Sequence, residues 1–323
     1  MSQLYLGIDL GGTNIKAGLC DPEGNILEKQ SVKTGKERPY GEIIADMAAL
    51  CRRVCESAGH DFGEIEGIGI GSPGTVDSRT GSIFYANNLR WHDVPVGKTL
   101  SALLDREVFV TNDANAAALG EARFGAGRAF SSSVLLTLGT GVGGGVVLDG
   151  KLFEGFRSAG AEVGHMIIRM DGEPCTCGLR GCLEAYASAT ALIRDTRRAM
   201  DAHPESAMWK IAPSLEAVDG RTAFAAAREG DAAAREVVQN YIHALATGII
   251  ALVNVLRPEA VIVGGGVGAE GDYLLDPLKK QVYEGIYGGD SYAPLQILRA
   301  ERGNDAGLLG AAAYAKDRMT ERK

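Results

Sequence analysis

Three cysteines lie close together in one short stretch of the chain. Cys175, Cys177 and Cys182 fall within CTCGLRGC, whereas the other three cysteines are scattered. Six cysteines in 323 residues are too sparse for a disulfide scaffold, and thiols this close together are typical of metal sites. Buried thiols or an adventitious disulfide are the alternatives. The spacing therefore favours a bound metal ion.

Two glycine-rich stretches have the composition of phosphate-binding turns. DLGGTNIK and TLGTGVGGG each end an apolar run, and the N–H groups that such turns expose bind anions. Two better-known nucleotide motifs do not fit. VGKTL has His92 where a P-loop needs glycine, and neither GIGSPG nor GTGVGG leads into a helix, as a dinucleotide site requires. Ordinary hairpin glycines are the alternative for each stretch, but two copies favour a phosphate held by both.

Asp113 is the carboxylate best placed for catalysis. It follows the strand-like run VFVTN and precedes the helix-like run ANAAALGEA. A carboxylate in this position can take the proton of a hydroxyl as that oxygen attacks a phosphorus atom. It can equally cap the helix. The residues by themselves leave the two interpretations open.

Several motifs follow one another along nearly the whole chain: GIDLGGTNIKAGL, GIGSPGTVD, NDANAAALGE, TLGTGVGGGVV, AEVGH, CTCGLRGCLE and VIVGGGV. In this order they resemble the ROK family of sugar kinases and repressors, and most closely its bacterial glucokinases. The resemblance implies an α/β, actin/hexokinase-like fold of duplicated RNase H-like domains, with ATP and a hexose in an interdomain cleft. It also implies ATP-dependent phosphorylation of glucose to glucose 6-phosphate.

The resemblance gives particular residues a role, and Asp113 matches the family's general base. The positions that match sugar contacts are Gly74, Asn88, Asn112, Asp113, Glu162, His165 and Glu184. The positions that match ATP contacts are Asp9, Gly11, Gly12, Thr13, Asn14, Lys16, Thr140, Gly141, Gly265 and Gly266. The last two glycines could instead only turn a strand into a helix. Magnesium is expected with ATP, and Asp9 is expected to contact it through water.

The same resemblance completes the metal site with a histidine. His165 lies ten residues before Cys175, and three thiolates with one imidazole are preferred zinc ligands. The expected ligands are His165, Cys175, Cys177 and Cys182. Because four protein ligands leave no open position for water, the zinc should be structural. It would anchor Glu162 and Glu184, which flank the cluster in the sequence.

Specificity at the 2-position of the sugar depends on pocket shape, which no motif specifies. A kinase for N-acetylmannosamine, N-acetylglucosamine or mannose is therefore the alternative within the class. A sugar-responsive ROK repressor lacking its DNA-binding domain is a further alternative, although the first strand is expected to begin already at Leu4. Ala161 departs from the family's usual glycine, and we expect it to tighten the loop before Glu162. The resemblance suggests a homodimer or homotetramer.

The elements that must position these residues follow an α/β pattern. Apolar runs at 4–9, 15–20 and 26–31 predict three strands around glycine turns, and runs at 134–138, 145–148 and 151–153 repeat the unit. Further strands are expected at 65–71, 108–111, 260–263 and 295–300. Helices are expected at 40–58, 96–104, 114–123, 185–200, 222–229, 232–256, 273–283 and 306–318. We expect a small N-terminal α/β domain, residues 1–113, joined by the C-terminal helix 304–323, and a large α/β domain, residues 114–303, with the zinc loop.

Composition narrows the possible partners. A formal charge of -8 and a pI near 5.3 argue against non-specific nucleic-acid binding, which needs a basic face. The amino-terminal residues show no basic region before a long apolar run, so no secretory signal is expected. The apolar runs are shorter than the ~20 residues of a membrane span. We therefore expect a cytoplasmic protein that binds neither nucleic acid nor membrane.

Overall fold

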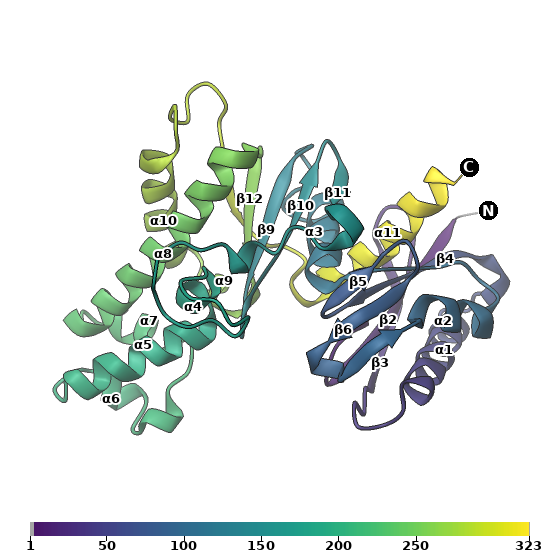
Figure 1. The fold of residues 1–323 in the computed structure, drawn as a ribbon, viewed down its shortest axis with the longest axis horizontal. Helices are drawn as coiled ribbons and strands as arrows, with labels where there is room; N and C mark the ends of the chain where they lie inside the picture. Colours follow the sequence, from purple (N-terminus) through teal and green to yellow (C-terminus); the bar gives the residue numbers. More distant parts are fainter. Residues whose placement is uncertain (1–2, 323) are drawn as a thin grey trace. The chain divides into compact units, whose positions relative to one another are not determined.

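Two five-stranded sheets form the framework of the computed structural model, which describes residues 3–322 (Figure 1). The first has the strand order β3-β2-β1-β4-β8 and the second β11-β10-β9-β12-β13. If the strands of each sheet are numbered in chain order, the spatial order in both sheets is third, second, first, fourth, fifth. The duplicated unit expected from the two glycine turns is therefore present.

The strands begin and end close to the expected residues. The first sheet contains β1 (Leu4–Leu10), β2 (Asn14–Cys20), β3 (Ile26–Lys33), β4 (Ile65–Ser72) and β8 (Val108–Asn112). The second contains β9 (Ser133–Leu138), β10 (Val142–Leu148), β11 (Lys151–Phe153), β12 (Ala260–Gly264) and β13 (Gln296–Arg299). A third, antiparallel sheet, which the sequence did not predict, contains β5 (Thr75–Asp77), β6 (Ser82–Ala86) and β7 (Trp91–Val94).

The helices connect these strands or follow them. They are α1 (Tyr40–Ser57), α2 (Val96–Leu104), α3 (Asp113–Phe124), α4 (Glu184–Ala187), α5 (Ala189–Ala202), α6 (Met208–Ile211), α7 (Thr222–Arg228), α8 (Ala232–Leu256), α9 (Gly265–Gly268), α10 (Asp272–Gly285) and α11 (Ala306–Glu321). The continuous helix expected over 185–200 is wrong. The chain breaks at Ser188, whose extended backbone ends α4 and whose side chain accepts the N–H of Ala191 and so caps α5.

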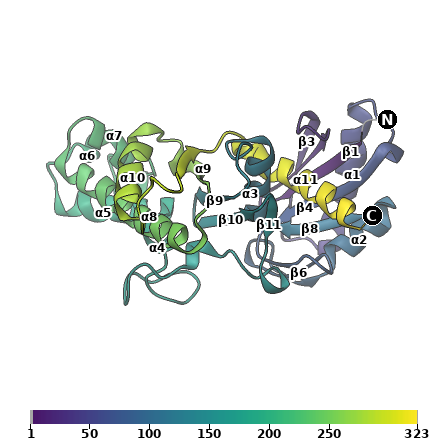
Figure 2. The same ribbon diagram turned by 90° about the horizontal axis from the view of Figure 1, so that it is seen from above.

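The inner strands of the first sheet are buried on both faces, whereas residues of the edge strand β3 alternate between exposed and half-buried. Strand β1 pairs antiparallel with β2 and parallel with β4, and β4 pairs parallel with β8. Alternate residues of β1 point to opposite sides, so that Leu6 and Ile8 join the core under α1 and α2, whereas Tyr5 joins the core under α3 and α11. Helix α11 runs along this sheet (Figure 2). Helices on both faces explain why the strands read as nearly unbroken apolar runs.

The chain divides into two compact units. The first comprises the residues up to Leu135, Gly145–Ala161 and the residues from Glu301 onward; the second comprises Leu136–Gly144 and Glu162–Ala300. Helices α3 and α11 pack against each other and both belong to the first unit. The compact units therefore do not coincide with a division near Asp113. The expected domains, residues 1–113 with 304–323 and residues 114–303, stay a prediction.

Helix α8 is the longest helix of the second unit. By length and composition alone it could cross a membrane. The expectation that the chain contains no such segment overlooked this helix. Most of its apolar window is buried against the other elements of its unit, including α5, α7 and α10. Core helices of soluble proteins pass the same test, so α8 is weak support for a membrane span.

Candidate functional site

The carboxyl ends of β1, β4 and β8 lie side by side in the first unit. The parallel register places Asp9 beside Gly71, and Gly71 beside Thr111. Asn112 and Asp113 follow Thr111 directly. Ligands of open α/β sheets bind beyond this edge, because loops and helix starts meet there. The structure thus brings Asp9 and Asp113, which the sequence assigned to different substrates, to one end of one sheet.

Asp113 is the first residue of α3, and its side chain is exposed. The N-cap is Asn112, whose Oδ1 accepts the N–H of Ala114 at 2.9 Å and that of Asn115 at 3.3 Å. The Oδ1 of Asp113 also accepts the Ala114 N–H, at 2.8 Å. Because Asn112 caps the helix, capping alone does not explain a carboxylate at position 113.

Two loops bring further predicted sugar contacts to this end of the sheet. The Nδ2 of Asn112 donates to the carbonyl of Gly74 at 3.1 Å. Asn88 lies in the 3-10 turn Asn87–Leu89, next to the first glycine turn. A Cβ added to Gly12 would stand 3.2 Å from the Asn88 carbonyl oxygen. Residues from three separate stretches of sequence therefore meet here.

The first glycine turn connects β1 to β2. The N–H of Gly11 donates to the carbonyl of Asn14 at 3.0 Å and closes the turn. Thr34 is fully buried and fixes it from outside: its hydroxyl donates to the Gly11 carbonyl at 2.6 Å, and its N–H donates to the Thr13 carbonyl at 3.0 Å. Sequence reasoning missed Thr34, because a single threonine after an edge strand gives no signal of its own.

Asp9 and Lys16 face each other across β1 and β2. Their carboxylate and ammonium are 3.1 Å apart, and the two side chains are 26% and 38% exposed. A partly exposed pair of this kind contributes at most about 1 kcal/mol to folding. Its more specific effect is to hold the lysine ammonium at the end of the sheet beside the glycine turn.

Glu154 was not predicted, yet it links three elements of the first unit. Its Oε1 accepts the hydroxyl of Thr111 at 2.8 Å, and its Oε2 accepts the hydroxyl of Tyr314 at 3.0 Å. Thr111 lies in β8 directly before Asn112, and Tyr314 lies in α11. Burial, followed by the charge of Glu154, raises the pKa of Tyr314, so this phenol stays a donor at neutral pH. The network braces strand β8, which ends directly before Asp113.

The segment that follows Glu154 has a strained backbone. Arg157, Ser158 and Ala161 adopt φ angles of 52°, 58° and 61°, in the left-handed region. The left-handed conformation costs a residue with a Cβ roughly 1–2 kcal/mol. Ala161 occupies the position where the family's usual residue is glycine, directly before Glu162. Ala161, which we expected to tighten this loop, thus has a left-handed conformation that glycine would adopt without strain.

Replacing Ala161 with glycine should therefore stabilise the protein, by up to about 1 kcal/mol, since relief of the strain exceeds the added freedom of the unfolded chain. Urea unfolding followed by circular dichroism measures the change. Ala159→Gly is the matched control, because Ala159 has a φ of -104° that needs no glycine. That control should lose roughly 0.4–1 kcal/mol. Equal losses of unfolding free energy in Ala161→Gly and Ala159→Gly would contradict the assignment of strain to Ala161.

The cysteine cluster lies in the second unit, and its four predicted ligands converge. One ligand atom from each of His165, Cys175, Cys177 and Cys182 lies within 4.8 Å of all the others. The Sγ atoms of Cys177 and Cys182 are 3.7 Å apart, and the Cys175 Sγ is 3.6 Å from the His165 Nδ1. Tetrahedral zinc with Zn–S near 2.3 Å puts its ligand atoms about 3.8 Å apart. The residues fit a metal ion of this size.

The backbone of the loop explains how the ligands meet. Gly181 has a φ of +82°, and a Cβ there would lie 1.8 Å from the Arg169 carbonyl oxygen, so only glycine fits. Cys182, the next residue, is fully buried. Burial raises the pKa of its thiol to about 12. A bound cation reverses this, because a coordinating thiol loses its proton outright.

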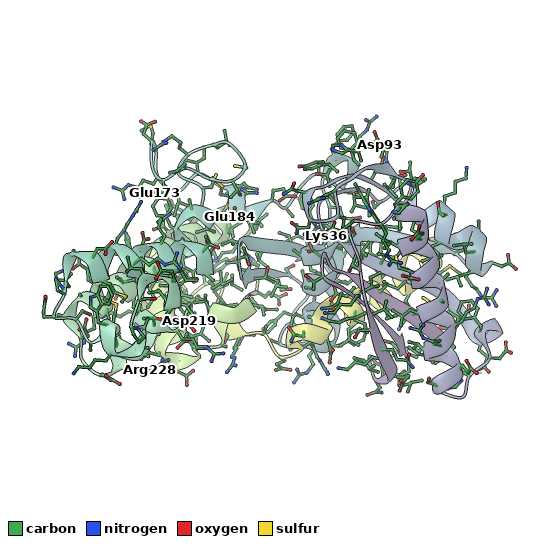
Figure 3. All side chains as sticks on the ribbon, turned by 90° about the horizontal axis from the view of Figure 1, so that it is seen from below. Lys36, Asp93, Glu173, Glu184, Asp219 and Arg228 are labelled. Atoms are coloured by element: carbon green, nitrogen blue, oxygen red, sulfur yellow. The ribbon has the colours of Figure 1, made fainter. Side chains whose placement is uncertain are left out.

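Glu184 is the first residue of α4 and lies at the base of the cysteine loop (Figure 3). Its Oε1 is 3.6 Å from the Cys175 Sγ, and its Oε2 accepts the N–H of Val142 at 3.1 Å. Glu162, which precedes the 3-10 turn Val163–His165, is exposed. The structure thus places Glu184 beside Cys175 of the cluster, whereas Glu162 lies three residues before His165 in the chain.

The remaining glycines of the predicted nucleotide site also lie in the second unit. Thr140 and Gly141 form the turn between β9 and β10. Gly264 ends β12, and Gly265 and Gly266 begin the short helix α9. These last glycines do turn a strand into a helix, which was the structural alternative. Their contact with a nucleotide stays a prediction.

Known proteins with this sequence pattern form one family. The ROK family model matches residues 5–318. The chain belongs to the ROK family. It is 39% identical over 315 residues to the glucokinase of Thermotoga maritima, covering 97% of this chain and 98% of that protein. It is 37% identical over 317 residues to the glucokinase of Streptomyces coelicolor, with the same coverage of 97% and 98%.

A solved structure agrees with this assignment. A ROK family glucokinase from Streptomyces griseus, in complex with glucose and AMPPNP, is 38% identical to this chain. It matches with a TM-score of 0.80 and covers 97% of this chain and 99% of that one. The family and the α/β, actin/hexokinase-like fold class predicted from the motifs are therefore confirmed. The roles of the individual site residues stay predictions.

Proposed function

We propose that this ROK protein phosphorylates glucose at the expense of ATP and releases glucose 6-phosphate and ADP. The observation that carries the proposal is the similarity, at 37–39% identity over almost the full length of both proteins, to relatives that are glucokinases. The site residues support it, because each position that matches a catalytic or sugar-binding residue of the family holds a chemically suitable side chain or glycine.

Asp113 is the general base of this reaction. It takes the proton from the 6-hydroxyl of glucose as that oxygen attacks the γ-phosphorus in line with the leaving ADP oxygen. Asn112 keeps the start of α3 in place through its two cap hydrogen bonds and positions the neighbouring carboxylate. Gly74, Asn88, Glu162, His165 and Glu184 contact the sugar.

Binding and neutralisation of the ATP phosphates account for the rest of the catalysis. Phosphoryl transfer needs little covalent help from a protein, but it needs charge stabilisation and alignment. Lys16 and the N–H groups of the two glycine turns provide positive potential, and Gly265 and Gly266 contact the adenosine. Magnesium enters with ATP as part of the substrate, and Asp9 contacts it through water.

His165, Cys175, Cys177 and Cys182 would hold zinc. The donor set suits that ion, and the distances between the ligand atoms fit its tetrahedral shell. With four protein ligands, the ion supplies structural cross-linking and no reactive water. His165 and Glu184 are thereby fixed in the orientation in which they meet the sugar.

A panel of hexoses tests the function. We expect the purified protein to release ADP, measured by a coupled assay, with a much higher kcat/KM for glucose than for mannose, N-acetylglucosamine or N-acetylmannosamine. A preference for an N-acetylated sugar would replace glucose as the substrate. A failure to phosphorylate any hexose, combined with sugar binding in calorimetry, would favour a sugar-responsive regulator. Cytoplasmic location and a dimeric or tetrameric assembly are part of the same proposal.

A further inference from the structure

The two carboxylate oxygens of Glu184 bind different loops of the second unit. Oε2 accepts the N–H of Val142, in the second glycine turn, at 3.1 Å. Oε1 accepts the hydroxyl of Thr176, in the cysteine loop, at 2.9 Å. Thr176 lies between the expected metal ligands Cys175 and Cys177. One side chain therefore connects the metal loop to the turn that is expected to hold the ATP phosphates.

One short segment of chain, from Glu184 to Thr190, makes three hydrogen bonds to the second glycine turn. Besides the bond from Val142 to Glu184, the N–H of Ala189 donates to the Gly139 carbonyl at 2.8 Å. The hydroxyl of Thr190 donates to the Thr140 carbonyl at 2.7 Å. The two latter bonds come from the start of α5. Of these three hydrogen bonds, the one that Val142 donates to Glu184 differs, because its acceptor, the Glu184 carboxylate, is itself oriented by the cysteine loop.

The turn is packed tightly against this carboxylate. A Cβ added to Gly141 would lie 2.3 Å from the Oε2 of Glu184 and 3.2 Å from its Cδ. A small rotation of the carboxylate therefore changes its contact with the turn. Thr176 opposes that rotation, because its hydroxyl donates a charge-assisted hydrogen bond to the carboxylate.

Thr176 is the nearer of two side chains of the cysteine loop that face this oxygen. Its hydroxyl lies 2.9 Å from the Oε1 of Glu184, whereas the Sγ of Cys175 lies 3.6 Å away. The Thr176 hydroxyl is therefore the donor of this loop that orients the oxygen. Its side chain is exposed, so its removal leaves no hole in the core.

We propose that Thr176 is a positioning residue that acts through Glu184 on the turn Gly139–Val142. Through this contact the cysteine loop sets the geometry of the ATP-phosphate site as well as that of the sugar site. This inference rests on the proposed function for its kinetic consequences. Its structural consequence is a change in the turn Gly139–Val142 when the Thr176 hydroxyl is removed. This change does not depend on which sugar is the substrate.

The test compares Thr176→Val with Thr176→Ser. Valine keeps the shape and removes the donor, whereas serine keeps the donor. We expect Thr176→Val to raise the KM for ATP roughly 5-fold and to raise the KM for glucose as well, with zinc content and melting temperature unchanged. Thr176→Ser should restore both constants to those of the parent protein.

Two measurements separate this inference from the proposed function. Calorimetric titration with AMPPNP, without sugar, should show the same loss of nucleotide affinity in Thr176→Val. Hydrogen–deuterium exchange should show faster exchange at the peptide containing Val142. An unchanged AMPPNP affinity with unchanged exchange at Val142 would overturn the inference, even in an active glucokinase. Weaker AMPPNP binding and faster exchange would support it even if no hexose were phosphorylated.

Discussion

Asp113→Asn is expected to lower kcat by roughly 100-fold or more and to leave glucose affinity close to that of the parent protein. The amide keeps the shape of the side chain and can still accept the N–H of Ala114, but it cannot take a proton from the attacking hydroxyl. The N-cap hydrogen bonds of Asn112 are untouched, so α3 should begin at the same residue. A coupled ADP assay gives kcat, and calorimetry with glucose gives the affinity.

Asp105→Asn is the matched control for the change in charge. Asp105 is exposed, ends α2 in a left-handed conformation that asparagine also tolerates, and has no predicted role at the site. Its kcat should stay at the parent value. A turnover of Asp113→Asn within a few-fold of the parent would remove Asp113 from the role of general base, and glucose binding lost together with turnover would indicate a role in binding instead.

The inner strands of the two five-stranded sheets could be predicted because they are nearly continuous apolar runs beside glycine turns. In strand β1 all residues are buried except Asp9, which is half-buried. The convergence of Cys175, Cys177 and Cys182 could be predicted because three thiols at short spacing are rare without a metal, whereas His165 was added from the family resemblance. In both cases a local pattern carries the structural information.

Contacts between distant residues could not be predicted in this way. Thr34 and Thr176 each support a predicted site residue, and Glu154 supports Thr111, which precedes Asn112. Each acts through one hydrogen bond or two to partners set by the fold. The break at Ser188 was missed for a similar reason, because the alanine-rich sequence on both sides favours a helix. The left-handed conformation of Ala161 was visible only as a departure from the family's glycine.

Loss of the metal should have the second large effect. Cys177→Ser removes one of four ligands, and we expect the purified variant to contain far less zinc than the parent, which should hold about one ion per chain. The melting temperature should fall by several degrees, because the loop between His165 and Cys182 has little apolar core of its own: Ile167, Met170 and Leu179 in it are exposed. Affinity for glucose should fall with it, since Glu184 and His165 lose their fixed orientation.

Cys55→Ala separates loss of metal from loss of a thiol. Cys55 is buried in α1 and belongs to the first unit, whereas the cluster belongs to the second, so its replacement should lower stability through packing and leave the zinc content unchanged. Metal analysis of the three proteins after dialysis against a weak chelator decides between the outcomes. If the parent protein contains no zinc, is fully active and does not become more stable when zinc is added, the four residues form a thiol cluster without a structural ion. Loss of zinc and of glucose affinity confined to Cys177→Ser, with glucose affinity in the parent protein falling when zinc is removed and returning when it is added back, would support a role of the ion in organising the sugar-binding carboxylates.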